Sequence, residues 1–126
     1  FNAVKNKKLV IFEPHFRRNY IHINDVVDAI IYSIRNFNRM KSNVYNLGLS
    51  SANLTKIMLA KKIKKQLRSL KIKIVKNRKD PDQRDYYVSN RKIEKKGFKP
   101  KVKIEDGIKE LIKIFIHSKE KIINKY

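Results

Sequence analysis

The stretch from Arg17 to Ile30 constrains the fold more than any other, because a strand pattern in it is followed at once by a helix pattern. Residues 20–23 alternate in character as a half-buried strand does, and Asn24 is a favourable helix N-cap. The apolar residues that follow share one helical face, and they are Val26, Val27, Ile30, Ile31 and Ile34. We therefore predict a short strand that leads directly into a capped helix, with the arginines in the loop before the strand.

Arg18 lies immediately before the predicted strand, where the backbone can hold it rigidly. A guanidinium offers a planar fork of donors that matches phosphate oxygens, so Arg18 is a candidate for binding an anion. The alternative is an ordinary surface arginine beside a strand–helix turn, which is the commoner situation. The spacing of residues in this stretch favours the surface arginine, but both roles of Arg18 stay open.

The rest of the chain predicts alternating strands and helices, which is the pattern of an α/β fold. Short apolar or alternating runs predict strands at 9–12, 44–48 and 71–76, and apolar stripes predict helices at 55–67, 89–93 and 104–115. We predict N-caps at Thr55 and Ser89, and we expect Gly97 to stop the helix that Ser89 begins. We predict a loop from Asn77 to Gln83 and a frayed tail after His117.

The charge of the chain needs an explanation, because 32 Lys and Arg against 11 Asp and Glu give a formal net charge of +21 in 126 residues. Such a balance is common in proteins that bind nucleic acids. The lysines, however, are scattered through every segment and accompany many Ile, Asn, Tyr and Phe residues. This favours a general residue bias over a basic patch, although a small nucleic-acid-binding module stays open as an alternative.

Composition also bears on location and on metal sites. Cysteine is absent, which excludes disulfides and thiol nucleophiles and fits a reducing compartment. No apolar run approaches the roughly 18 to 20 residues needed to cross a bilayer. The three histidines lack metal-ligand spacing, and the aspartates at 80, 82 and 85 stand beside a proline and an arginine that favour a turn. We expect a cytoplasmic chain with no metal and no membrane segment.

The three glycines, Gly48, Gly97 and Gly107, are too far apart for a phosphate-binding loop. A dinucleotide fold needs closely spaced glycines, so that backbone N–H groups can approach the pyrophosphate at a helix N-terminus. We therefore expect no cofactor-binding residues in this chain.

Four stretches together resemble the extended short-chain dehydrogenases/reductases, the NAD(P)-dependent sugar-nucleotide epimerases and dehydratases. They occur in the order in which that family has them, and they are RRNYIHINDVVDAI at 17–30, VYNLG at 44–48, DPDQRDYYVSNRKI at 80–93 and GFKPKVKIEDGIKELI at 97–112. The resemblance implies that residues 1–126 are the C-terminal, substrate-binding portion of a Rossmann-type enzyme. The Gly-rich nucleotide-binding half would precede Phe1.

The same resemblance implies where a nucleotide sugar binds. In the family, one arginine precedes the strand before the helix, and Arg18 matches it. A second arginine of the family lies in a loop with the pattern "R-P-G-D-x-R". Arg84 matches the last arginine of this pattern. The first arginine of the pattern is replaced by Lys79 or is shifted by one position to Arg78. The substrate-binding residues are thus predicted to be Arg18, Arg84, Arg78 and Lys79. The family's catalytic Tyr-x-x-x-Lys is absent, because Tyr87 is followed four residues later by Arg91.

The parent protein implied by the resemblance is an isomerase or lyase of carbohydrate biosynthesis that uses NAD or NADP. Its partners would be the nucleotide sugar, the missing nucleotide-binding half and, in a homodimer, a second copy. The chain alone would be catalytically silent, and a non-catalytic fragment with a structural role is a further alternative. Without that half, faces of the helix at 25–34 and of the strand at 44–47 are expected to be uncovered, which predicts a marginal or self-associating fragment.

Overall fold

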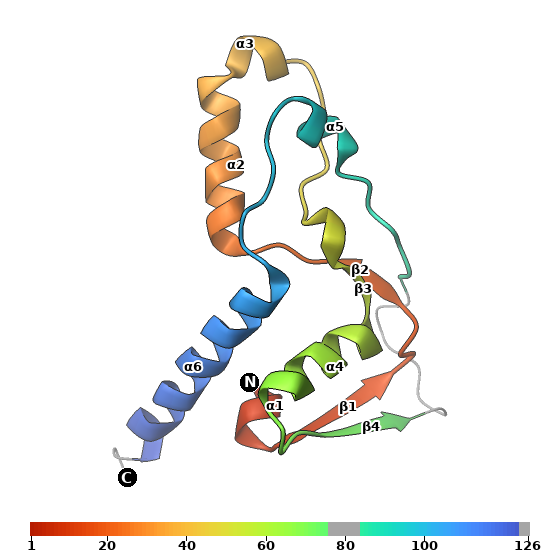
Figure 1. Ribbon diagram of the computed structural model, residues 1–126, viewed down its shortest axis with the longest axis vertical. Coiled ribbons are helices and arrows are strands. Elements are labelled where there is room, and N and C mark those ends of the chain that lie inside the picture. Colours follow the sequence, from red (N-terminus) through yellow and green to blue (C-terminus); the bar gives the residue numbers. More distant parts are fainter. Residues whose placement is uncertain (76–83, 124–126) are drawn as a thin grey trace.

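The computed structural model describes residues 1–75 and 84–123 (Figure 1). It combines helices with short strands, including a parallel pair, which confirms the predicted α/β class. In order they are α1 (Asn2–Lys5), β1 (Lys8–Phe12), β2 (Arg17–Asn19), α2 (Ile23–Arg35), α3 (Phe37–Met40), the short 3-10 turn η1 (Ser50–Ala52), β3 (Asn53–Thr55), α4 (Lys56–Gln66), β4 (Lys71–Val75), α5 (Arg91–Lys95) and α6 (Ile104–Ile123).

The strands form two small sheets that lie near each other on one side of the molecule (Figure 1). β1 and β4 are parallel, with Lys8 opposite Lys71 and Phe12 opposite Val75. β2 and β3 are antiparallel, and Arg18 is opposite Leu54. α4 connects β3 to β4 and lies between the sheets and α6, while α2 and α3 extend toward the opposite end (Figure 1).

Buried side chains hold α2, α3 and α5 together. The cluster consists of Ala29, Met40, Ile93 and Phe98, with Tyr32, Tyr45 and Leu47 packed against it. A buried carboxylate also joins α2 to the segment before α6. Asp25 is 1% exposed, and its two oxygens accept hydrogen bonds from the backbone N–H groups of Lys101 (2.8 Å) and Val102 (3.1 Å).

The strand predicted at 20–23 is wrong, because the strand lies earlier, at Arg17–Asn19. Pairing with β3 fixes this position, and Tyr20 already bonds outside the ladder, to the Ala52 carbonyl (3.1 Å). The predicted cap at Asn24 is also wrong. His22 is the N-cap of α2, and its Nδ1 accepts from the Asn24 backbone N–H (3.2 Å). The arginines are therefore on the strand and not in a loop before it.

The outward face of α2 is apolar. Exposed fractions are 66% for Ile23, 48% for Val27, 56% for Ile30 and 69% for Ile34. This confirms that the predicted apolar helix leaves that face uncovered.

The strand predicted at 44–48 is not formed within the described part of the chain. A strand requires a neighbour for its N–H and C=O groups, and neither sheet of the described residues offers these positions one. Val44 is 84% exposed, while Tyr45 and Leu47 pack against the buried cluster.

The observed helix ends agree more closely with those predicted from the sequence. The Thr55 hydroxyl accepts from the Met58 N–H (3.2 Å) and caps α4, as predicted. Gly97 follows α5 with a φ of +104°, a conformation that favours glycine. The N-cap of α5 is Asn90 rather than Ser89. α6 continues to Ile123, beyond His117, where we expected fraying.

Candidate functional site

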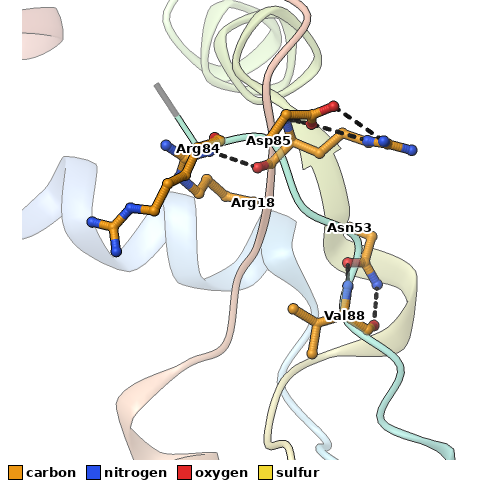
Figure 2. A network of polar contacts seen from close by, with 6 residues as sticks. Arg18, Asn53, Arg84, Asp85 and Val88 are labelled. Carbon is orange, nitrogen blue, oxygen red and sulfur yellow. Dashed lines mark hydrogen bonds and ion pairs between the residues drawn. The ribbon is translucent and has the colours of Figure 1, made fainter. Parts of the chain in front are cut away.

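Two of the four predicted substrate-binding residues lie together in the structure. Arg18 is the central residue of β2, and Arg84 belongs to the segment that leads to α5. The Arg18 Nη1 donates to the carbonyl of Arg84, which is 66 residues away in sequence, and to the carbonyl of Arg17 at 2.8 Å. Figure 2 shows the two arginines side by side. Arg78 and Lys79 lie outside the described residues.

The ring of Tyr86 supports the Arg18 guanidinium. The guanidinium carbon lies 5.1 Å from the ring centroid, which is within the range of a cation–π contact. The cation–π contact and the hydrogen bonds to two carbonyls restrict the direction of the guanidinium. Burial raises the pKa of the nearby Tyr20 hydroxyl, and Tyr86 raises it further, while the positive charge of Arg18 opposes both effects.

Arg17 fastens the segment that contains Arg84 to β2. Its Nε and Nη2 donate to the two carboxylate oxygens of Asp85, each at 3.1 Å, and its backbone N–H donates to Oδ1 at 2.7 Å. The side-chain hydrogen bond from Arg17, followed by the backbone one, lowers the pKa of the Asp85 carboxyl. The same pair raises the pKa of Arg17. Arg17 is thus paired within the protein.

A second attachment lies further along the same segment. The Asn53 side chain donates to the Val88 carbonyl (3.0 Å) and accepts from the Val88 N–H (2.9 Å), as a neighbouring strand would (Figure 2). Together with Asp85, this pair holds the backbone of 84–88 against β2 and β3. The sequence analysis predicted neither the Arg17–Asp85 nor the Asn53–Val88 attachment. The only signal for the second was the polar residue Asn53 beside an apolar residue of the strand.

An apolar cavity of about 540 Å³ is lined by Tyr20, the start of α2, α4 and α6. Its volume is within the usual range for small-molecule sites. His22 is on its wall and uses both ring nitrogens within the protein: Nδ1 caps α2, and Nε2 lies 3.0 Å from a carboxylate oxygen of Glu110. His22 therefore has a structural role here.

The described residues offer little for cofactor or metal binding. Residues 1–75 and 84–123 contain no group of three or more His, Cys, Asp or Glu side chains that could hold a metal ion. Gly97 follows α5 and Gly107 lies in the first turn of α6, so these two glycines do not form the closely spaced pair of a pyrophosphate-binding loop. Within the same part of the chain, no helix is long and apolar enough to span a membrane.

No family model matches the chain. A solved GDP-D-glycero-L-gluco-heptose synthase from Campylobacter jejuni matches it with a TM-score of 0.64 and 25% identity, over 86% of this chain and 33% of that one. A GDP-6-OMe-4-keto-L-xylo-heptose reductase from C. jejuni matches with a TM-score of 0.68 and 25% identity, over 90% and 35%. The chain has the fold of part of an extended short-chain dehydrogenase/reductase. An NAD-dependent NDP-hexosamine 5,6-dehydratase of tunicamycin biosynthesis shares this fold, with a TM-score of 0.71 and 18% identity, over 92% and 38%.

The predicted resemblance to the extended short-chain dehydrogenases/reductases is therefore confirmed. The chain spans only about a third of the length of these solved structures. The C. jejuni synthase was solved in the presence of NADPH, and the dehydratase is described as NAD dependent. The descriptions of these three proteins name a GDP-linked heptose, a GDP-linked keto-heptose and an NDP-hexosamine.

Proposed function

We propose that this chain is the C-terminal, substrate-binding part of a sugar-nucleotide enzyme of the extended short-chain dehydrogenase/reductase family. Its role is to hold the diphosphate of a nucleotide sugar between Arg18 and Arg84. The observation that supports this most strongly is that the Arg18 guanidinium bonds to the backbone of Arg84, 66 residues away in sequence, and lies over the ring of Tyr86.

The chemistry of Arg18 and Arg84 suits a diphosphate better than an anion with a single charge. A guanidinium matches two phosphate oxygens at once, and hydrogen bonds to charged groups are the strong ones. Arg84 is exposed, and Tyr86 is 42% exposed, so solvent reaches this face of the protein. We propose that Arg78 and Lys79, which precede Arg84 closely in sequence, supply further positive charge to the same phosphates.

Cofactor binding and the proton-transfer residues belong to a different part of the protein in this proposal. A nicotinamide cofactor, NAD or NADP, would be held by the nucleotide-binding half ahead of Phe1, because the glycines of this chain do not fit one. The reaction of the whole protein would be an epimerisation, a dehydration or a reduction of the sugar. This chain contributes substrate binding to it and no catalytic residue.

The proposal is tested by titrating the complete polypeptide with nucleoside diphosphates and nucleotide sugars. Each charge-assisted contact contributes about 1.5–3 kcal/mol, so Arg18→Ala and Arg84→Ala should each weaken binding by roughly tenfold or more. Arg18→Lys should recover only part of the loss, because it keeps the charge but not the fork. The matched control is Arg39→Ala, which removes an equal charge from an exposed position in α3. Equal affinity in the parent and both alanine variants would refute the proposal.

A further inference from the structure

Arg17 and Arg18 are neighbours on β2, and their side chains bond to adjacent residues of one distant segment. The Arg18 guanidinium donates to the Arg84 carbonyl, and the Arg17 guanidinium pairs with the Asp85 carboxylate. Successive side chains of a strand point to opposite faces, so these contacts hold the backbone at 84–85 from two directions. The pair of Arg17 and Asp85 therefore helps to fix where Arg84 lies relative to Arg18.

The Asp85 carboxylate accepts three hydrogen bonds from Arg17. Nε and Nη2 donate to its two oxygens, each at 3.1 Å, and the backbone N–H donates to Oδ1 at 2.7 Å. A fork of this kind fixes the orientation of both groups as well as their distance. The Arg17 side chain is 46% exposed and that of Asp85 is 34% exposed, and ion pairs at such positions contribute little to global stability. We therefore expect the pair to act on the local order of the segment rather than on the free energy of unfolding.

Charge alone would make Asp85 an unfavourable neighbour for an anion-binding arginine. It follows Arg84 directly, and a carboxylate near a phosphate opposes binding of that phosphate. Removing Asp85 thus has two opposite effects on a bound diphosphate. The protein gains one unit of positive charge, which favours binding, and the segment that carries Arg84 loses an attachment, which disfavours it. The sign of the change in affinity shows which effect is larger.

We propose that Arg17 and Asp85 are positioning residues for diphosphate binding. Their ion pair holds the backbone that carries Arg84 and that accepts the hydrogen bond from Arg18, so both guanidinium groups are ordered before the ligand arrives. Affinity increases when groups are ordered in advance, because less conformational entropy is lost on binding. This inference rests on the proposed function, since it takes the same diphosphate as the ligand. It adds two residues that act on the ligand only through Arg18 and Arg84.

The test is calorimetric titration of the complete polypeptide with GDP, UDP and TDP and with the corresponding nucleosides, at about 150 mM salt, where charges more than about 8 Å apart are largely screened. Asp85→Ala should lower the diphosphate-to-nucleoside affinity ratio by about three- to tenfold, although it makes the protein more positive, because freed arginine side chains must be ordered on binding. The control Asp28→Ala removes the same charge from a 50% exposed side chain on α2 and should leave the ratio unchanged. An unchanged or higher ratio in Asp85→Ala would overturn the proposal, since general loosening of the fold would weaken nucleoside and diphosphate binding alike.

A double variant tests whether the two residues act as a pair. Arg17→Ala should also lower the ratio, and adding Asp85→Ala to it should cause no further loss, because both changes remove the same attachment. Losses that multiply would contradict a shared role. Arg18→Ala in the same assay separates this inference from the proposed function. If Arg18→Ala and Arg84→Ala both leave the ratio unchanged, the proposed function and the inference fail together; if they lower it while Asp85→Ala does not, only the positioning role is refuted.

Discussion

Replacing Asp25 by asparagine should destabilise the protein far more than the same change at Asp28, although both belong to α2. The Asp25 carboxylate is 1% exposed and accepts two backbone hydrogen bonds, at 2.8 Å and 3.1 Å, from Lys101 and Val102. Asparagine keeps one acceptor oxygen but turns an NH₂ group toward the second N–H. One hydrogen bond to a charged group is lost and a buried donor is left without a partner, which costs about 1.5–3 kcal/mol.

Asp28 offers the matched comparison. Its side chain is 50% exposed and lies 4.0 Å from the Lys101 ammonium. Exposed pairs of this kind contribute about 0–1 kcal/mol, so Asp28→Asn should change the free energy of unfolding very little.

Urea denaturation of the complete polypeptide measures the difference. With a slope of about 2 kcal/mol per molar urea, a loss of about 2 kcal/mol lowers the unfolding midpoint by roughly 1 M. Faster amide exchange at Lys101 and Val102 in Asp25→Asn would show that the loss occurs where α2 meets the segment before α6. Equal midpoints for the two variants would refute the view that Asp25 joins these segments.

Three other outcomes follow from the structure. Gly97→Ala should lower the free energy of unfolding by about 1–2 kcal/mol in urea titrations, because its φ is +104° and a Cβ would lie 2.6 Å from the Tyr32 hydroxyl. Arg17 lowers the pKa of Asp85, so their attachment is fully present above the unfolded value near 3.9 and is lost as the pH falls through the lower folded value. The amides of 84–88 should therefore lose protection from exchange as the pH falls, and the Asp85→Asn variant should lack this pH dependence. Filter-binding assays should show that DNA affinity disappears near physiological salt, because scattered lysines neutralise phosphates only diffusely; sequence-selective binding at nanomolar concentration would instead support the nucleic-acid alternative.

Local features of the fold could be predicted because their causes lie within a few residues. Thr55 caps α4 through the third N–H beyond it, and Gly97 adopts the left-handed conformation that ends α5. β1 was predicted from the short apolar run near Val10, and it lies at Lys8–Phe12. The order of four motifs was sufficient to indicate the family.

Features that depend on distant segments could not be predicted. The strand at Arg17–Asn19 is fixed by pairing with β3, and nothing near the arginines in sequence indicates that register. The cation–π contact of Arg18 with Tyr86 and the Asn53–Val88 pair likewise join residues far apart in the chain. For the segment 44–47 the pattern is that of a strand, but forming one depends on a neighbour that the described residues do not supply.

The most direct test of the central claim compares the affinity of the complete polypeptide for a nucleoside diphosphate with its affinity for the bare nucleoside. Calorimetric titrations with GDP and guanosine, and with the uridine and thymidine pairs, isolate the contribution of the two phosphates. If Arg18 and Arg84 hold the diphosphate, each alanine variant should reduce the diphosphate-to-nucleoside affinity ratio by roughly tenfold or more and leave nucleoside binding unchanged. An unchanged ratio in both variants would contradict the account and would make the two arginines ordinary surface residues.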